Sequence, residues 1–103
     1  MTVFINKLTL TGEAQELEKS YAHVAEHMET QPGLIRYLLV RSTKDPDVYY
    51  NVAEWESEEL FRASVSDSIF RERLGHVTKV MTGEPHLTEV VLHGQGLSAV
   101  RPD

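Results

Sequence analysis

The sequence of 103 residues contains no cysteine, which excludes disulfides, thiolate nucleophiles and cysteine-based metal or iron–sulfur sites. Basic residues are few and scattered, with 10 Lys and Arg against 16 Asp and Glu, so we expect no nucleic-acid partner. No apolar run reaches membrane-spanning length, and residues 1–7 lack the basic and apolar regions of a signal peptide. We therefore expect a cytoplasmic protein that has no membrane association.

Several signatures of catalysis and cofactor binding are missing as well. The chain has no Gly-x-Ser-x-Gly motif, no glycine-rich phosphate loop and no dinucleotide fingerprint after a predicted strand. His23 and His27 are four residues apart on a predicted helix, but His-Val-Ala-Glu-His differs from the zinc-peptidase motif. The other histidines show no metal-ligand spacing. We expect no bound nucleotide or flavin and no metal site.

What the sequence does contain is a regular succession of apolar patterns. Alternating and helically spaced apolar residues predict strands over 2–10, 34–42, 47–55 and 86–93, a long helix over 13–30, and shorter helical segments from 57 and from 67. The order β-α-β-β-α-β predicts a ferredoxin-like α+β fold, in which an antiparallel sheet carries its helices on one face. We expect one domain over 1–94 and a C-terminal tail over 95–103.

The predicted layers leave one sheet face without a cover. A chain of this length buries only about two thirds of its unfolded surface, so its own core is modest. A second copy of the chain is the simplest cover for the open face. The sequence therefore predicts a homodimer.

Two asparagines stand out because they fall among apolar strand positions. Alternation along residues 47–55 puts these side chains on one face: Tyr49, Asn51, Ala53 and Trp55. In the first strand, Asn6 shares a face with Phe4. If Asn6 and Asn51 project between sheet and helices, their NH2 groups could stabilise negative charge on a substrate oxygen. The alternatives are hydrogen-bonded structural amides and a Trp55 that serves only as a core aromatic.

Three segments carry a resemblance to a known family: Phe4–Leu8, Gln31–Ile35 and Tyr50–Phe61. With the pattern from Val3 to about Leu92, they resemble the antibiotic biosynthesis monooxygenase family, whose members are small dimeric α+β barrels. The Pro-Gly turn and the Trp-Glu-Ser-Glu-Glu-x-Phe run are fairly specific for that family. They say little about the reaction.

Two enzyme branches of that family differ at the site. The anthrone oxygenases of aromatic polyketide pathways use a first-strand Asn and an Asn-x-x-x-Trp motif, which fall on Asn6, Asn51 and Trp55. A helix Tyr of some of these enzymes falls on Phe61. The haem-degrading branch adds a Trp and a His ligand, but the corresponding residues here are Ser64 and Leu74.

The resemblance thus implies a cofactor-independent monooxygenase that oxidises a small, hydrophobic, anthrone-like aromatic polyketide to a quinone, with O2 as co-substrate. The implied catalytic residues are Asn6, Asn51 and Trp55, and the expected substrate-binding residues are Tyr49, Phe61, Phe4 and Leu74. Two alternatives stay open. One is a haem-binding or haem-degrading monooxygenase, and the other is a non-catalytic dimer that binds a small ligand.

Overall fold

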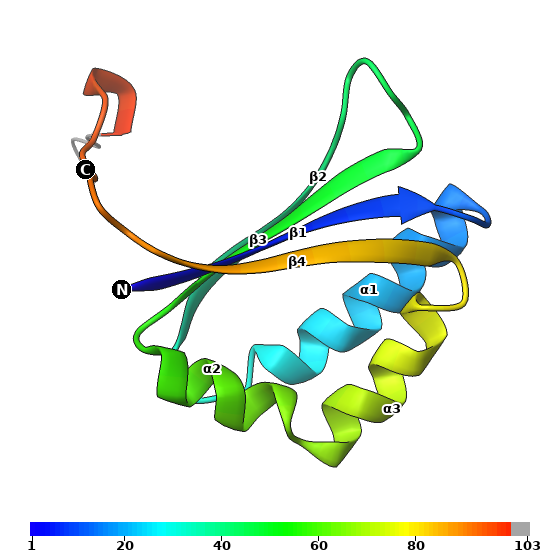
Figure 1. Ribbon diagram of the computed structural model, residues 1–103, viewed down its shortest axis with the longest axis horizontal. Coiled ribbons are helices and arrows are strands. Elements are labelled where there is room, and N and C mark those ends of the chain that lie inside the picture. Colours follow the sequence, from blue (N-terminus) through cyan, green and yellow to red (C-terminus); the bar gives the residue numbers. More distant parts are fainter. Residues whose placement is uncertain (100–103) are drawn as a thin grey trace.

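A four-stranded antiparallel sheet forms one layer of the molecule, and three α-helices form the other (Figure 1). The computed structural model describes residues 1–99. Their elements, in chain order, are β1 Thr2–Leu10, α1 Ala14–Met28, β2 Leu34–Arg41, β3 Val48–Trp55, α2 Glu58–Val65, α3 Ser68–Val77, β4 Met81–Glu89 and a short 3-10 turn, η1 Leu97–Ala99. The strand order β2-β3-β1-β4 confirms the predicted ferredoxin-like α+β fold.

Local sequence signals explain where the helices begin and end. The Ser57 side chain caps α2 by accepting a hydrogen bond from the backbone N–H of Leu60. Asp67 caps α3 in the same way and accepts from two backbone N–H groups, so the chain turns between the helices. Gly33 has a φ of +95°, a conformation that L side chains rarely adopt, and it leads the chain from α1 into β2.

The last strand is not where the sequence predicted it. We expected the last strand over 86–93, beginning only after Gly83-Glu84-Pro85, but β4 spans Met81–Glu89 and contains that tripeptide. It pairs with β1 without interruption from Met81 to Glu89. A proline is tolerated here because β4 is an edge strand, where one side of the backbone needs no partner strand. Residues 90–93 lie beyond the end of β4.

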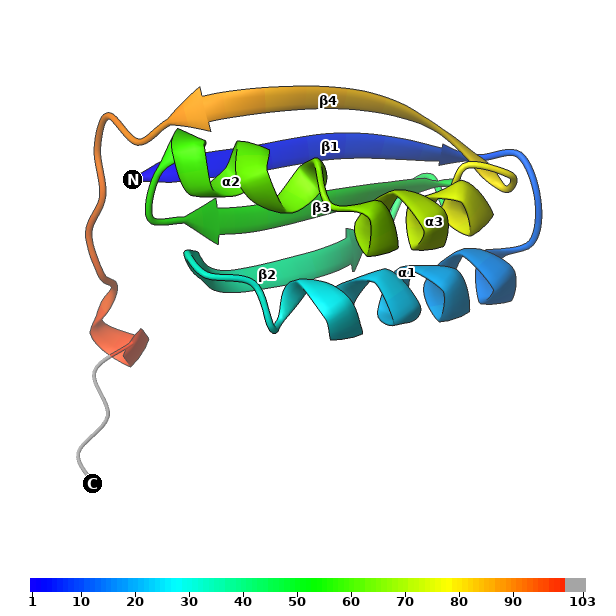
Figure 2. The ribbon, with the colours of Figure 1, turned by 90° about the horizontal axis from the view of Figure 1, so that it is seen from below.

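The two faces of the sheet differ in their surroundings. The best-buried large side chains, Leu8, Leu17, Trp55 and Val77, lie between sheet and helices. Figure 2 shows α1 and α3 side by side under the sheet. Two hydrogen bonds link them. His27 Nε2 of α1 lies 2.7 Å from Oδ2 of Asp67, the residue that caps α3, and Arg73 of α3 donates to the backbone carbonyl of His23 in α1. No α-helix of residues 1–99 covers the other sheet face.

The C-terminal segment leaves the sheet after β4 and runs away from it (Figure 1). Val91, Leu92 and Leu97 are almost fully exposed along this path. The division into a domain over 1–94 and a tail over 95–103 stays a prediction, and residues 100–103 lie outside the described part of the chain. Within residues 1–99, no helix is long and apolar enough to cross a membrane.

Candidate active site

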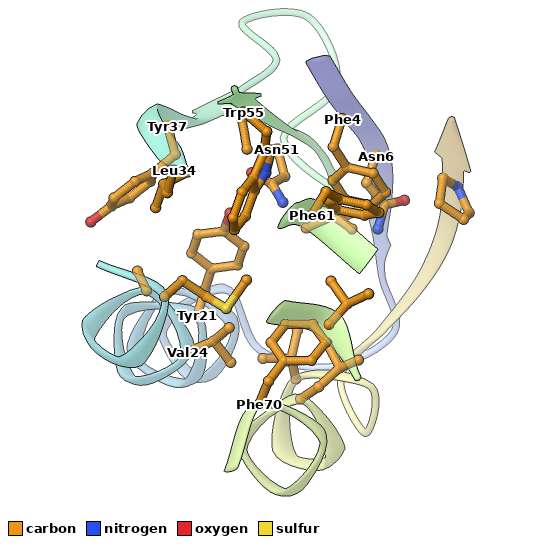
Figure 3. A pocket seen from close by; sticks show the side chains of 18 of the residues that line it. Phe4, Asn6, Tyr21, Val24, Leu34, Tyr37, Asn51, Trp55, Phe61 and Phe70 are labelled. Atoms are coloured by element: carbon orange, nitrogen blue, oxygen red, sulfur yellow. The ribbon is translucent and has the colours of Figure 1, made fainter. Parts of the chain in front are cut away.

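A cavity of about 300 Å³ lies between the sheet and the helices (Figure 3). All four strands and all three α-helices described above contribute to its lining, which is mainly aliphatic and aromatic. Its polar side chains are two asparagines, two tyrosines and one tryptophan. No charged residue and no histidine among residues 1–99 lines it. The cavity therefore suits an apolar molecule that carries a few hydrogen-bonding groups.

Two amides stand next to each other on the sheet wall of this cavity. Asn6 of β1 and Asn51 of β3 are direct partners in the antiparallel register, and both line the cavity. Side chains in such pairs have Cβ atoms about 4.5–5.5 Å apart. Alternation along each strand predicted which face each asparagine occupies, but only the register shows that the two amides are neighbours.

The buried polar atoms of this region have no protein partner. Within residues 1–99, the buried side-chain nitrogen and oxygen atoms that lack a hydrogen bond are Asn6 Oδ1, Asn51 Oδ1 and Trp55 Nε1. Leaving such a group unpaired costs about 1–3 kcal/mol, and most buried polar groups in proteins are paired. The three predicted catalytic residues are therefore the three whose polar groups are left for something else to satisfy.

An aromatic cluster shapes the wall beside the amides. Trp55, at the end of β3, is only 1% exposed, and its ring meets Phe61 edge-on at a centroid distance of 5.6 Å. Phe61 in turn stacks on Phe4, with centroids 5.0 Å apart and an angle of 30° between the rings. All three residues line the cavity. A flat aromatic ligand would meet faces and edges of rings here.

The edge strand β4 restricts one of the amides. A Cβ added at Gly83 would lie 3.1 Å from Asn6 Oδ1 and 3.3 Å from Asn6 Nδ2. The absence of a side chain at position 83 thus lets β4 lie close to this amide and limit its movement. This role of Gly83 was not predicted, because the last strand was expected to begin after it, and only the pairing of β4 with β1 reveals it.

The remaining predicted substrate-binding residues separate into two groups. Leu74 of α3 lines the cavity together with Phe4 and Phe61. Tyr49 shares the helix-facing side of β3 and is buried, but it does not line the cavity. Its hydroxyl donates to Glu18, and the Arg41 guanidinium lies 5.1 Å from its ring centroid. Strand alternation identifies a face, but it does not show where along the strand the cavity ends.

Two tyrosines of the lining were not among the predicted site residues. Tyr21 enters from α1 and Tyr37 from β2. Burial raises the pKa of the Tyr21 phenol well above its usual value, and the nearby Tyr37 raises it further. A hydrogen bond to the Glu29 carboxylate is the main cause of the raised pKa of Tyr37. The helical spacing of Tyr21 predicted that it faces the sheet, and its hydroxyl was one of four that could orient a ligand, but the sequence did not show that a cavity lies there.

A histidine-ligated haem does not fit these residues. Among residues 1–99, the lining has no histidine to hold an iron and no cationic side chain to pair with haem carboxylates. His27 is engaged by Asp67 and is not part of the lining. Ser64 is buried, and Leu74 places an isobutyl group in the cavity, as the sequence implied.

Comparisons with known proteins agree with this fold and differ among themselves in chemistry. A model of the antibiotic biosynthesis monooxygenase family matches residues 1–75. A mycobilin-producing haem oxygenase of Mycobacterium tuberculosis is 39% identical over 83 residues, which are 79% of each chain. Deoxynogalonate monooxygenase of Streptomyces nogalater is 32% identical over 75 residues, which are 73% of this chain and 61% of that protein.

Among solved structures, SnoaB from Streptomyces nogalater is described as a cofactor-independent oxygenase. It superimposes on this chain with a TM-score of 0.84 at 27% identity, over 93% of this chain and 95% of SnoaB. One sequence relative thus acts on haem, whereas the oxygenase with the similar structure needs no cofactor. The residues of the cavity must discriminate between these two chemistries.

Proposed function

The chain belongs to the antibiotic biosynthesis monooxygenase family, and we propose that it is a cofactor-independent oxygenase that converts an anthrone-like aromatic molecule to its quinone. The observation that supports this most is that two neighbouring amides, Asn6 and Asn51, and the Trp55 indole line one cavity, and that no charged residue among residues 1–99 lines it. A flat aromatic substrate would match the apolar lining. Its hydroxyl groups could donate to the unpaired Oδ1 atoms, and its carbonyl oxygen could accept from the NH2 groups.

The substrate supplies the reactive electrons in this proposal. Loss of a proton from the methylene of an anthrone gives an anion whose charge is spread onto the carbonyl oxygen across the ring. The NH2 groups of Asn6 and Asn51 would donate to that oxygen and stabilise the anion. Such hydrogen bonds are stronger in a cavity from which water is excluded than in bulk solvent. The protein thus raises the fraction of substrate that can react with O2.

Oxygen transfer then requires no external reductant. The anion passes one electron to O2, and the resulting radical and superoxide combine to form a C–O bond at the former methylene carbon. The Trp55 indole N–H would donate to the peroxide oxygen. Protonation of the peroxide and loss of water give the second carbonyl of the quinone. One oxygen atom enters the product and the other leaves as water.

The direct test is oxygen uptake by purified protein in the presence of a chelator, with dithranol or emodin anthrone as substrate. We expect uptake above the buffer rate and one quinone formed per O2 consumed, measured by absorbance. No uptake above buffer would overturn the proposal. Retention of the anthrone or quinone without oxygen uptake would instead favour a ligand-binding protein.

A haem oxygenase is the second candidate, because the mycobacterial haem oxygenase is 39% identical to this chain. Titration of the protein with haemin tests it. A Soret shift at equimolar haemin, followed by loss of the band when a reductant and O2 are added, would favour haem degradation. From the lining described above, we expect no stoichiometric complex.

We also propose that the enzyme is a cytoplasmic homodimer in which a second copy covers the open sheet face. That face carries exposed apolar side chains on the edge strand β2 and its neighbour β3, with Leu38 60% exposed and Val40 and Tyr50 close to it. In the sheet, Leu38 pairs with Val52 and Val40 pairs with Tyr50, so these side chains form one continuous patch. Such patches mark interaction surfaces.

A further inference from the structure

The polar groups of the cavity are not confined to its sheet wall. Asn6, Asn51 and Trp55 come from the strands, whereas Tyr21 comes from α1 in the helix layer. In Figure 3 the Tyr21 ring rises from α1 toward the side of the cavity that carries Asn51 and Trp55. A molecule held by the two amides would therefore also face the Tyr21 hydroxyl, which comes from the opposite layer of the fold.

Tyr21 differs from two other buried or half-buried tyrosines in its hydrogen bonding. The hydroxyl of Tyr37 donates to Glu29, and that of Tyr49 donates to Glu18. The Tyr21 side chain forms no hydrogen bond within residues 1–99, and its pKa is raised by burial and by Tyr37 rather than by any hydrogen-bonded partner. It stays a neutral phenol at any physiological pH. It can therefore donate to a ligand, but it cannot act as a base or as an anionic metal ligand.

The charge of the lining limits what that ligand can be. Because no Lys, Arg or His of the described residues lines the cavity, a buried carboxylate or phosphate would have no cationic partner. The available groups are two amides, an indole N–H and one free phenol. They match an uncharged aromatic molecule whose oxygens lie at more than one position on its rim.

We propose that Tyr21 is a substrate-specificity residue that donates a hydrogen bond to a second oxygen of an uncharged polyphenolic substrate, distinct from the oxygen held by Asn6 and Asn51. This inference rests on the proposed function, since it names the substrate class of the same cavity. Tyr21 acts in it as a donor to a ring hydroxyl or ring carbonyl. Substrates that lack this oxygen gain nothing from the tyrosine.

The test compares Tyr21→Phe with wild type on substrates that differ in ring hydroxyls. Anthrone carries none, dithranol carries two beside its carbonyl, and emodin anthrone carries a further one. We expect kcat/KM of Tyr21→Phe to fall about tenfold on at least one hydroxylated substrate, mainly through KM, and to stay at the wild-type value on anthrone. Tyr50→Phe is the matched control, because it removes a tyrosine hydroxyl from the opposite face of β3, away from the cavity, and it should change none of these ratios.

Two outcomes would overturn the inference. An equal loss on all three substrates would mean that Tyr21 only supports the fold, and unchanged values on all three would mean that it touches no substrate oxygen. Measuring how tightly each variant binds the product quinones tests the role of Tyr21 without relying on turnover. If wild type consumes no O2 but Tyr21→Phe weakens binding of dihydroxyanthraquinone and not of anthraquinone, the proposed reaction fails while the role of Tyr21 stands.

Discussion

The two faces of one sheet break the usual distribution of polar and apolar groups in opposite ways. On the helix-covered face, polar atoms of Asn6, Asn51 and Trp55 are buried without partners. On the open face, apolar side chains such as Leu38 and Val40 are exposed to solvent. Adjacent strands of one sheet thus carry buried polar atoms on one face and exposed apolar side chains on the other. We proposed a small aromatic substrate for the first face and a second copy of the chain for the second.

The largest expected effect comes from the covered face. Asn51→Leu should lower turnover of an anthrone by about 10²–10³, because one donor to the developing negative charge is lost. The same change should leave the melting temperature unchanged or raise it, since an unpaired buried amide is replaced by an apolar side chain. Oxygen uptake and thermal unfolding measure the two quantities.

Lys7→Ala is the matched control for this change, because Lys7 follows Asn6 in β1 and points to the opposite face of the sheet. It should leave turnover unaltered. If Asn51→Leu loses activity and stability together, the amide is a structural group and the contrast between the faces disappears.

A change on the open face should act on association and not on the cavity. Leu38→Glu places a charge in the centre of the exposed apolar patch and should weaken self-association by at least about 100-fold, because the carboxylate would be buried without a partner. Sedimentation velocity across a concentration series measures this, and circular dichroism checks the fold. A wild-type chain that sediments as a monomer at high concentration would refute the dimer.

A substitution at Gly83 tests whether the edge strand β4 holds the side-chain amide of Asn6 in place. In Gly83→Ala the new methyl group would crowd both polar atoms of Asn6, so we expect about a tenfold loss of kcat while the sheet remains intact. Gly75→Ala is the control, since a Cβ there meets no atom within 4 Å and alanine favours the helix. Equal turnover of the two variants would show that Asn6 needs no such support.

The smallest expected effect concerns the hydrogen bond between His27 and Asp67, which lies outside both the cavity and the open sheet face. Backbone hydrogen bonds, first that of Phe70, and the bond to His27 hold the pKa of the Asp67 carboxylate below its usual value. A carboxylate with a lowered folded pKa stabilises the fold above its unfolded pKa, near 3.9, and loses that contribution as the pH falls through the folded value. Asp67→Asn should therefore flatten the dependence of the melting temperature on pH below about 4 and leave turnover at pH 7 intact. If the melting temperature of the variant still falls steeply below pH 4, other carboxylates cause the loss of stability in acid.

The sequence was sufficient to predict the fold class and the face of a strand on which each side chain lies. It was not sufficient to predict how far along each strand the cavity extends. Alternation correctly placed Asn51 and Trp55 on the side of the helices, because a strand has only two faces. It also grouped Tyr49 with them, although the cavity ends before that residue. Position along a strand depends on how the helices cross it, and no local pattern records that crossing angle.

The position of β4 was wrong for a related reason. Glycine and proline at 83 and 85 are turn residues in most contexts, and only the place of β4 at the edge of the sheet makes them compatible with a strand. The proximity of Gly83 to Asn6 follows from that pairing, so it could not be predicted either. Tyr21 was predicted to pack on the sheet, and its place in the cavity lining required the three-dimensional structure. The roles of the site residues stay predictions.

Pro85 on the edge strand has a consequence for how copies of this chain can meet. A proline has no N–H, so β4 offers an incomplete row of donors to any strand that approaches the sheet edge. Growth of the sheet by addition of strands from other molecules is thereby discouraged on this side, while the apolar face remains available. At the β4 edge, contact through the open face is therefore favoured over the addition of strands, as the proposed dimer requires.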